Sequence, residues 1–368
     1  MAGLGMMYED GDGVEKNQTE AVLWYSRAAK LNDPTGLVRL AFCLQNGEGI
    51  QRDEAEAFVL LRKATDLQET KAFGRLGRCY LYGKGIEKSE EEGIKLLREG
   101  AKRNDYYSMV ILGNYLVGTD TKAKNALEGL ALLRRAVDGG DDEAMIILSA
   151  CYHKGIGVKK NLSTATEWLR KAAERGNVKG MKYYAGQLLT GEGVATDEVE
   201  AVKWYGRAAG KGDPESMRMI ASCYLKGTGI QKDEKAAYYW FKRASELGDI
   251  NSTYNLGGLS YRGTGTAKSD GEAIKNWLKA AQLGDVDAML AVAGCYENGV
   301  GTSCSLAEAF KWIQKAAELG NLEAIRKVEA CFREGKGIAA NLTEAEKWRK
   351  KAEELEAKEK GAIIPAGK

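Results

Sequence analysis

The chain has 368 residues, and its 54 lysines and arginines are nearly balanced by 52 aspartates and glutamates, for a net charge of +2. This balance excludes the strong overall positive field that attracts nucleic acids or anionic membranes. No apolar run approaches the roughly 18 residues that a membrane-spanning helix needs, and the start, MAGLGMMYEDGDG, lacks the basic-then-apolar order of a signal peptide. We therefore expect a cytoplasmic protein without nucleic acid partners or membrane insertion.

The sequence repeats itself with a period of 36 residues. One copy precedes the others at the start of the chain, and nine further copies begin at Gly36, Ala72, Ser108, Ala144, Gly180, Ser216, Ser252, Ala288 and Ala324. Self-similarity at such a period indicates a solenoid, in which each unit buries its apolar face against its neighbours. We expect one array over residues 1–359 and a short flexible tail at 360–368.

The first half of each copy has the pattern of a helix with one buried side, here called helix A. In the copy at 216–251, Met217, Ile220 and Cys223 recur at helical spacing. Helix A is followed by Gly227 and Gly229, and nine of the ten copies carry such a glycine pair. Glycine serves where φ is positive or where backbones approach closely, so the pair predicts a turn between two helices.

A second helix, helix B, follows a good N-cap residue in every copy. The caps are Asn17, Asp53, Ser89, Asn125, Asn161, Asp197, Asp233, Ser269, Ser305 and Asn341. A glutamate stands three residues later in eight copies, which predicts an acidic capping box. Ala237 and Ala244, with Trp240 between them, predict close packing of helix pairs, and Gly248 predicts the end of helix B.

The first copies depart from this pattern. In the first copy, Leu4 and Met7 have no preceding helix pair to cover them, so we expect an upstream segment or a partner there. The next two copies have leucine in place of the helix B tryptophan and Gln68 and Asn104 in place of the closing glycine. These substitutions predict looser packing.

The fourth copy departs most, because Thr119 and Thr121 replace its glycine pair. A β-branched residue is costly at positive φ, so we expect this turn to follow a different path. The copies over 144–323 match the pattern best and are expected to be the most stable part. The last copy ends in a charged helix B, which suits the exposed end of a solenoid.

The pattern is complete in the copy at 252–287, at Leu256, Gly257, Gly263, Gly265, Ala273, Trp277, Ala280, Ala281 and Gly284. It resembles the Sel1-like repeat, a relative of the tetratricopeptide repeat. The resemblance implies an all-α, right-handed superhelical solenoid of ten helix-turn-helix units that acts as a non-catalytic adaptor for partner proteins. It also implies an alternative, a regulatory subunit that activates an enzyme in trans, as chitin-synthase activators of this family do.

Six of the seven cysteines occupy one position of helix A: Cys43, Cys79, Cys151, Cys223, Cys295 and Cys331. Equivalent atoms of successive units lie roughly 10 Å apart by helix-packing distances, which is too far for a disulfide. We predict buried core thiols, with Cys304 as an exposed one. Secreted cysteine-rich members of the family pair cysteines within a repeat, and this chain lacks such pairs, which favours a reducing compartment.

Nothing in the sequence predicts catalysis, a metal or a cofactor. The glycine pairs recur in nine of the ten units without a GxGxxG or GKS/T continuation, so we interpret them as architecture. The single histidine, His153, has no second imidazole for a metal site and is interpreted as a surface residue. A hydrolase, the remaining alternative, predicts loss of turnover when His153 is changed.

The surface of helix A is the predicted binding site. By analogy with tetratricopeptide arrays, helix A lines the concave side of the solenoid and exposes apolar groups there: Val110, Val117, Ile146, Leu189, Leu225, Tyr254, Tyr261 and Leu290. In the copies over 180–287 they are joined by Lys182, Arg218, Lys226 and Arg262. Aromatic and aliphatic groups bordered by cations suit a protein or peptide with apolar anchors and acidic neighbours, or a sugar stacked on the tyrosines.

Overall fold

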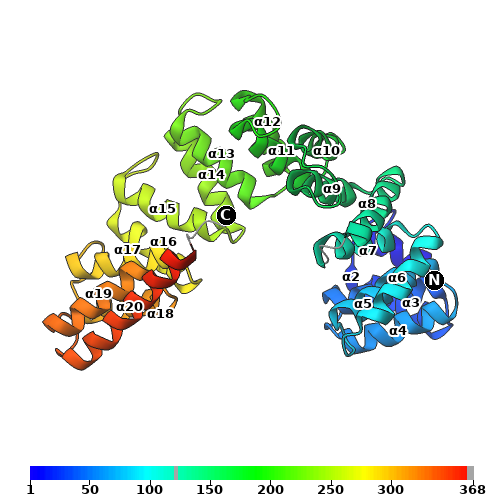
Figure 1. The fold of residues 1–368 in the computed structure, drawn as a ribbon, viewed down its shortest axis with the longest axis horizontal. Helices are drawn as coiled ribbons and strands as arrows, with labels where there is room; N and C mark the ends of the chain where they lie inside the picture. Colours follow the sequence, from blue (N-terminus) through cyan, green and yellow to red (C-terminus); the bar gives the residue numbers. More distant parts are fainter. Residues whose placement is uncertain (120–122, 363–368) are drawn as a thin grey trace. The chain divides into compact units, whose positions relative to one another are not determined.

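The computed structural model describes residues 1–119 and 123–362, which form twenty α-helices and no strand (Figure 1). The A helices are α1 (Ala2–Asp10), α3 (Pro34–Asn46), α5 (Thr70–Tyr82), α7 (Tyr106–Thr119), α9 (Asp142–Lys154), α11 (Val178–Thr190), α13 (Pro214–Lys226), α15 (Ile250–Arg262), α17 (Val286–Asn298) and α19 (Leu322–Glu334). The B helices are α2 (Gln18–Lys30), α4 (Glu54–Asp66), α6 (Glu90–Lys102), α8 (Ala123–Asp138), α10 (Leu162–Glu174), α12 (Glu198–Gly210), α14 (Glu234–Glu246), α16 (Asp270–Gln282), α18 (Leu306–Glu318) and α20 (Leu342–Ala362). The predicted all-α solenoid of ten helix-turn-helix repeats is confirmed.

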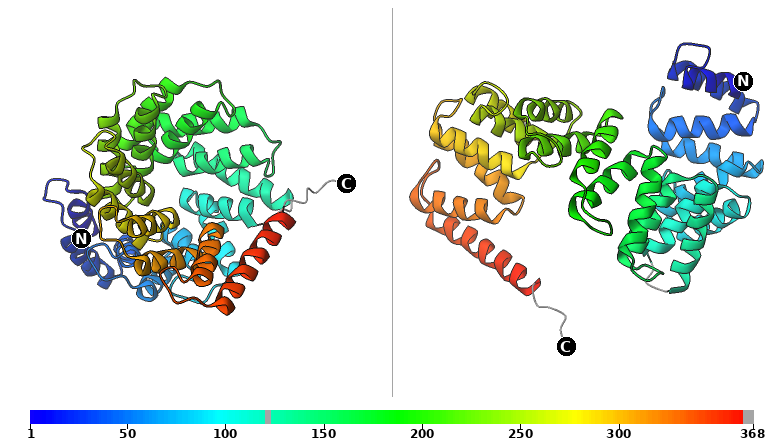
Figure 2. Two further views of the ribbon diagram at one scale, coloured as in Figure 1. Left: turned by 90° about the vertical axis from the view of Figure 1, so that its left-hand side faces the viewer. Right: turned by 90° about the horizontal axis from the view of Figure 1, so that it is seen from above.

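The chain divides into two compact units. The first unit comprises Met1–Gly180 with Glu192–Val194, and the second comprises Met181–Gly191 with Ala195–Lys368. Within each unit, helices A and B of a repeat pack against each other and successive pairs lie side by side (Figure 2). The described residues contain no helix that is long and apolar enough to cross a membrane.

The two glycines of each turn have different roles. In the turn after α13, Gly227 has φ of 73° and ends the helix in the left-handed conformation, as predicted. Gly229 also has positive φ, at 65°, but a Cβ there would additionally overlap the carbonyl oxygen of Glu198, the first residue of the preceding helix B. The same overlap with the first residue of the preceding helix B recurs at Gly49, Gly85, Gly193, Gly265, Gly301 and Gly337. The second glycine therefore sets how closely one repeat stacks on another.

The predicted N-caps are confirmed in nine repeats. In α14, for example, the Asp233 carboxylate accepts the Ala236 N–H at 3.0 Å. Asn125 is the exception, because α8 begins at Ala123 and Asn125 lies inside the helix. Thr119, expected in the turn, is the last residue of α7, and the path of the turn at 120–122, with Thr121, lies outside the described residues. The tail expected at 360–368 begins later, because α20 continues to Ala362, and the rest of it lies outside the described residues.

The capping glutamates do not complete the predicted box. The N–H of the cap donates instead to a carbonyl of its own helix A, as from Asp233 to Tyr224 at 3.0 Å. This bond recurs at all nine confirmed caps and ties the end of the turn to helix A. The glutamates pair instead with a lysine three residues later in five repeats, as Glu272 does with Lys275 at 3.2 Å.

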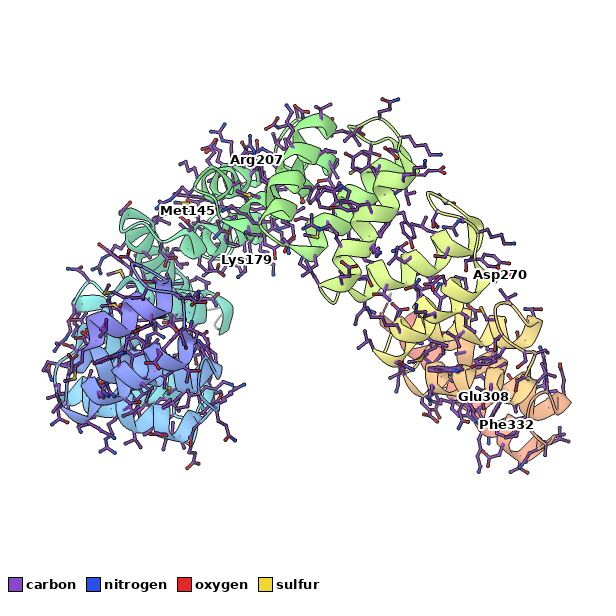
Figure 3. All side chains as sticks on the ribbon, turned by 180° about the vertical axis from the view of Figure 1, so that it is seen from behind. Met145, Lys179, Arg207, Asp270, Glu308 and Phe332 are labelled. Atoms are coloured by element: carbon purple, nitrogen blue, oxygen red, sulfur yellow. The ribbon has the colours of Figure 1, made fainter. Side chains whose placement is uncertain are left out.

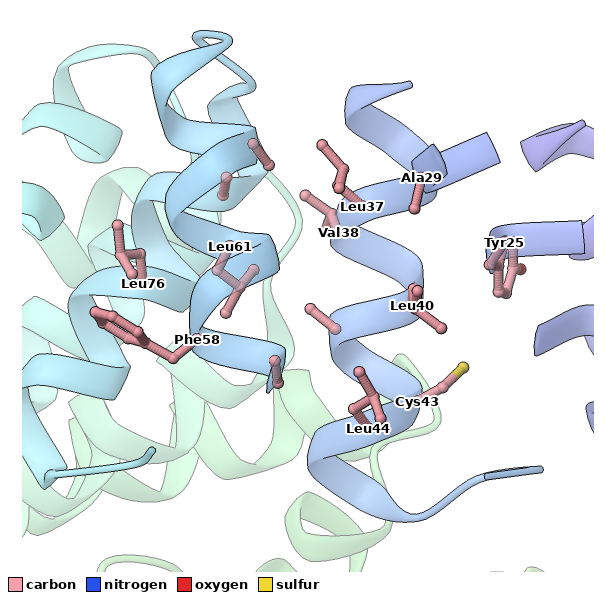
Figure 4. Packing of buried hydrophobic residues seen from close by; sticks show 14 of the residues in the cluster. Tyr25, Ala29, Leu37, Val38, Leu40, Cys43, Leu44, Phe58, Leu61 and Leu76 are labelled. Carbon is pink, nitrogen blue, oxygen red and sulfur yellow. The ribbon is translucent and has the colours of Figure 1, made fainter. Parts of the chain in front are cut away.

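The core consists of small residues from both helices, filled by larger apolar side chains. Ala237 and Ala244 are fully buried, as their predicted packing role requires. Cys43 lies in one core cluster with Leu40, Leu44 and Leu61 (Figure 4). All six helix A cysteines are buried and Cys304 is exposed, which confirms both predictions.

Six of the seven tryptophans lie on helix B with a cation three residues later over the ring. Arg207, labelled in Figure 3, lies 4.2 Å from the centroid of Trp204. The other pairs are Trp24 with Arg27, Trp168 with Lys171, Trp240 with Arg243, Trp312 with Lys315 and Trp348 with Lys351. Such cation–π pairs hold the indole against its own helix, and Trp277 is the exception.

Candidate functional site

The eight predicted site residues all lie in the second unit, on the A helices α11, α13 and α15. We call the surface formed by these eight residues the helix A face: Lys182, Leu189, Arg218, Leu225, Lys226, Tyr254, Tyr261 and Arg262. Lys226, Tyr261 and Arg262 are exposed, and the other five are half-buried. Most of the half-buried residues contact neighbouring repeats, whereas the exposed residues face solvent.

Lys182 and Arg218 take part in ion pairs between repeats. The Lys182 ammonium lies 2.5 Å from Glu215 and 3.8 Å from Asp213, both at the start of α13. Burial opposes its charge, but the hydrogen bond to Glu215 and the charges of both carboxylates raise the Lys182 pKa above its usual value. Arg218 repeats the arrangement one repeat later, with Asp249 at 3.6 Å. These two cations already have carboxylate partners within the chain.

Several predicted apolar groups belong to the packing between helices. Leu225 packs against the core cluster that contains Leu256 and Leu259 of the next A helix. Burial, together with the charges of Asp287 and Asp285, raises the Tyr254 pKa. In the first unit, the prediction that Val110 and Val117 are exposed is wrong, because each retains only 7% exposure in the core.

Two of the three aromatic residues of the repeat at 252–287, Tyr261 and Trp277, are displaced by one position. Ser260 stands where Tyr224 stands in the preceding repeat, and Tyr261 follows it. Likewise Asn276 stands where Trp240 stands, and Trp277 follows it. One step along a helix turns a side chain by about 100°, so this pair faces differently from its equivalents.

The displaced tryptophan packs against its own A helix. Its indole N–H donates to the Tyr254 carbonyl at 3.1 Å, and a Cβ on Gly257 would overlap the ring. The Trp277 and Tyr261 ring centroids lie 5.9 Å apart, and Tyr261 remains 41% exposed. This role of Trp277 was not predicted, although the position of Trp277 relative to the Ser269 cap already distinguishes it from the other tryptophans.

Two cations of the helix A face lie at equivalent positions of neighbouring repeats. Within the described part of the chain, Lys226 and Arg262 are both exposed and neither forms an ion pair. A Cβ on Gly258 would lie 3.3 Å from the Arg262 guanidinium, so this group extends over the helix backbone. Lys268 lies 5.6 Å from the Tyr261 ring centroid. Tyr261 is therefore an exposed aromatic group with Arg262 next to it in the chain and the Lys268 ammonium near its ring.

The chain's histidine is bound to a carboxylate. His153 Nε2 lies 2.9 Å from Glu192 Oε1, and both side chains are partly exposed. Among residues 1–118 and 125–358, no three His, Cys, Asp or Glu side chains are grouped to hold a metal ion.

The repeats match a known repeat family along nearly the whole chain. The Sel1 repeat model matches ten times along the chain, at residues 1–33, 34–68, 75–105, 107–141, 142–177, 180–213, 214–249, 250–285, 286–321 and 330–356. The chain belongs to the Sel1 repeat family. Sel1 repeat proteins generally mediate protein–protein interactions, and their tetratricopeptide-like fold is typically a non-catalytic scaffold.

Solved structures similar to this Sel1 repeat chain include the following two. A protective antigen of uropathogenic Escherichia coli with an SLR fold is 25% identical, with a TM-score of 0.60, over 95% of this chain and 75% of that one. A Sel1 repeat protein from Oxalobacter formigenes is 29% identical, with a TM-score of 0.56, over 66% of this chain and 96% of that one. No curated protein shows a significant sequence match.

Proposed function

We propose that this chain is a non-catalytic scaffold that binds a peptide segment of a partner protein on the helix A face. The observation that supports this most is the exposed Tyr261, which packs on Trp277 and precedes Arg262 in the chain. Arg262 and Lys226, which occupies the same position one repeat earlier, form no ion pair among the described residues. Aromatic groups dominate the energetics of protein interfaces, and unpaired cations select acidic partners.

The proposed ligand has an apolar anchor with acidic neighbours. The anchor packs on the Tyr261 and Trp277 rings, and the acidic residues approach Lys226 and Arg262. Lys182 and Arg218, which already form ion pairs with Glu215 and Asp249, hold the repeats together and do not contact the ligand.

Site-specific photo-crosslinking tests the position of the site. A photoreactive phenylalanine replaces Tyr261 in one variant and Tyr239 in another; Tyr239 is a matched control, because it lies on α14 and is 53% exposed. We expect a specific partner adduct from position 261 alone. Equal adducts from both positions, or an adduct from 239 alone, would contradict the proposal.

Charge reversal tests the electrostatics and separates the two functional alternatives. The double variant Lys226→Glu with Arg262→Glu is expected to lose the partner, whereas Lys235→Glu with Lys242→Glu on α14 retains it. Once the partner is purified, its activity is measured with and without the chain. Binding without a change in rate supports a scaffold, whereas a rise in rate supports activation in trans.

A further inference from the structure

The first unit has an arginine that lacks an acidic partner. Arg75 on α5 is half-buried, and its guanidinium lies 4.9 Å from the Phe42 ring centroid and 5.4 Å from that of Tyr107. The two rings come from α3 and α7, and α7 contacts α5 directly. Within the described residues, Arg75 forms neither an ion pair nor a hydrogen bond, so its charge is held between two aromatic rings with its N–H groups unused.

A second arginine adds positive charge at the same place. Arg78 lies three residues further along α5 and donates to the Tyr107 hydroxyl at 2.7 Å, and it too lacks a carboxylate partner among the described residues. Burial lowers the Arg75 pKa and repulsion by Arg78 and Arg39 lowers it further, whereas Tyr107 and Asp105 oppose this shift. Two cations one helical turn apart on a helix repel each other, so an anion bound between them would relieve this repulsion.

The nearby carboxylates are already occupied. Asp105 accepts the Ser108 N–H at 3.0 Å and caps α7. Glu9 pairs with Arg39 at 3.3 Å and accepts a hydrogen bond from the Tyr25 hydroxyl. The Asp105 charge attracts Arg75, but within the described first unit no carboxylate forms an ion pair with Arg75 or Arg78.

Arg78 also borders a small cavity of about 230 Å³. The cavity is lined by Arg78 together with Gln45, Asn46, Arg52, Glu54 and Lys84. Glu54 is paired with Arg52 and with Lys84, the latter at 3.4 Å, and its pKa is lowered by these partners, Arg52 first. Three cations against one carboxylate leave the cavity with excess positive charge.

We propose that Arg75 and Arg78 bind an oxyanion, a carboxylate or a phosphoryl group, carried by a peptide that lies along α3, α5 and α7. A guanidinium fork binds such groups through two parallel N–H bonds. The two rings hold Arg75 in place, so little side-chain freedom is lost on binding. The site lies in the first unit and is independent of the proposed Tyr261 site in the second.

Inorganic phosphate is the first probe, tested on the full chain at constant ionic strength. A bound anion stabilises the folded state, so phosphate is expected to raise the unfolding midpoint of the native chain more than that of Arg75→Gln. Arg98→Gln is the matched control, because Arg98 pairs with Glu128 at 3.0 Å and its loss changes the net charge equally. Its response to phosphate is expected to match that of the native chain, since general salt stabilisation acts on all variants alike.

Three peptides then distinguish the sources of the oxyanion. They differ at one position, which is phosphoserine, glutamate or alanine, and their binding is measured by fluorescence anisotropy. We expect the phosphoserine peptide, the glutamate peptide or both to bind at least about tenfold more tightly than the alanine peptide, and Arg75→Gln to remove this difference. Arg75→Lys keeps the charge without the guanidinium fork. Its affinity difference between the peptides is expected to lie between those of the native chain and of Arg75→Gln.

Two results would overturn the proposal. One is equal affinity for all three peptides, and the other is an equal loss of phosphate stabilisation in Arg75→Gln and Arg98→Gln. Circular dichroism checks that each variant is folded. If Arg75→Gln unfolds because the Phe42 and Tyr107 rings lose their partner, Arg78→Gln carries the same comparison, since the hydrogen bond that Arg78 donates among the described residues goes to the Tyr107 hydroxyl.

Discussion

At the scale of single residues, the chain adopts a left-handed backbone conformation just after helix B, and not every repeat has glycine at that position. Gln68 has φ of 65° after α4, whereas Gly248 has φ of 89° after α14. A side chain in this conformation costs about 1 kcal/mol. Gln68→Gly is therefore expected to raise the free energy of unfolding by about 1 kcal/mol, measured as a higher urea midpoint.

The reverse change at the equivalent position serves as its control. A Cβ on Gly248 would meet nothing within 4 Å, so Gly248→Ala is expected to lower the free energy of unfolding by about 1 kcal/mol through backbone conformation alone. Midpoints that do not move in opposite directions would contradict this explanation.

The cysteines differ in access to solvent. Cys304 is exposed, and the other six are buried in helix A. Ellman's reagent is expected to modify one thiol quickly in the folded chain and all seven in denaturant. Cys304→Ser is expected to abolish the fast reaction, and a fast second thiol would show that a core position opens in the native state.

At the scale of elements, the second glycine of each turn controls stacking between repeats. Gly265 has φ of 70°, and a Cβ there would overlap the Glu234 carbonyl of the preceding repeat. Gly265→Ala is therefore expected to lower the free energy of unfolding by a further 1 to 3 kcal/mol beyond the loss in Gly248→Ala. The two urea midpoints measure the difference, because both positions have positive φ and only Gly265 meets a neighbouring repeat. Equal losses would mean that conformation alone explains the glycine pair.

The elements could be predicted from the sequence because their signals are local. A cap such as Asp233 and a turn glycine such as Gly227 act within a few residues, so the period located nearly every helix end. The cap predicted at Asn125 is wrong because α8 starts at Ala123, three residues before the start that such a cap implies. The exposure predicted for Val110 and Val117 is wrong because helical spacing alone does not distinguish a side chain on the inner face from one packed between helices.

The candidate site was predictable only in part, since its chemistry depends on contacts between repeats. Lys182 and Arg218 looked like binding residues, yet each meets carboxylates at the start of the next A helix, about 31 to 33 positions later. The stack of Arg75 between Phe42 and Tyr107 likewise joins three repeats. Such pairs appear only once the stacking register is known.

At the scale of the whole molecule, both units depend on buried thiols at the same repeat position. Burial raises the pKa of Cys43 and Cys151 in the first unit, and of Cys295 in the second, from about 9 to about 11. The folded chain therefore holds these protons more tightly than the unfolded chain does. The resulting stabilisation is complete below pH 9 and is lost as the pH rises from 9 to 11.

This linkage predicts alkaline unfolding of the entire chain. Each pKa unit corresponds to about 1.4 kcal/mol. Ionisation of each of the three thiols is therefore expected to lower the free energy of unfolding by up to about 2 to 3 kcal/mol by pH 11. Urea midpoints measured from pH 8 to 10.5 under reducing conditions check the slope. Cys151→Ala removes one titrating core thiol and is expected to give a shallower decline, whereas Cys304→Ser leaves the slope unchanged because Cys304 is exposed. If the urea midpoints of Cys151→Ala and of the native chain decline in parallel with rising pH, ionisation of groups other than this thiol causes the loss of stability at alkaline pH.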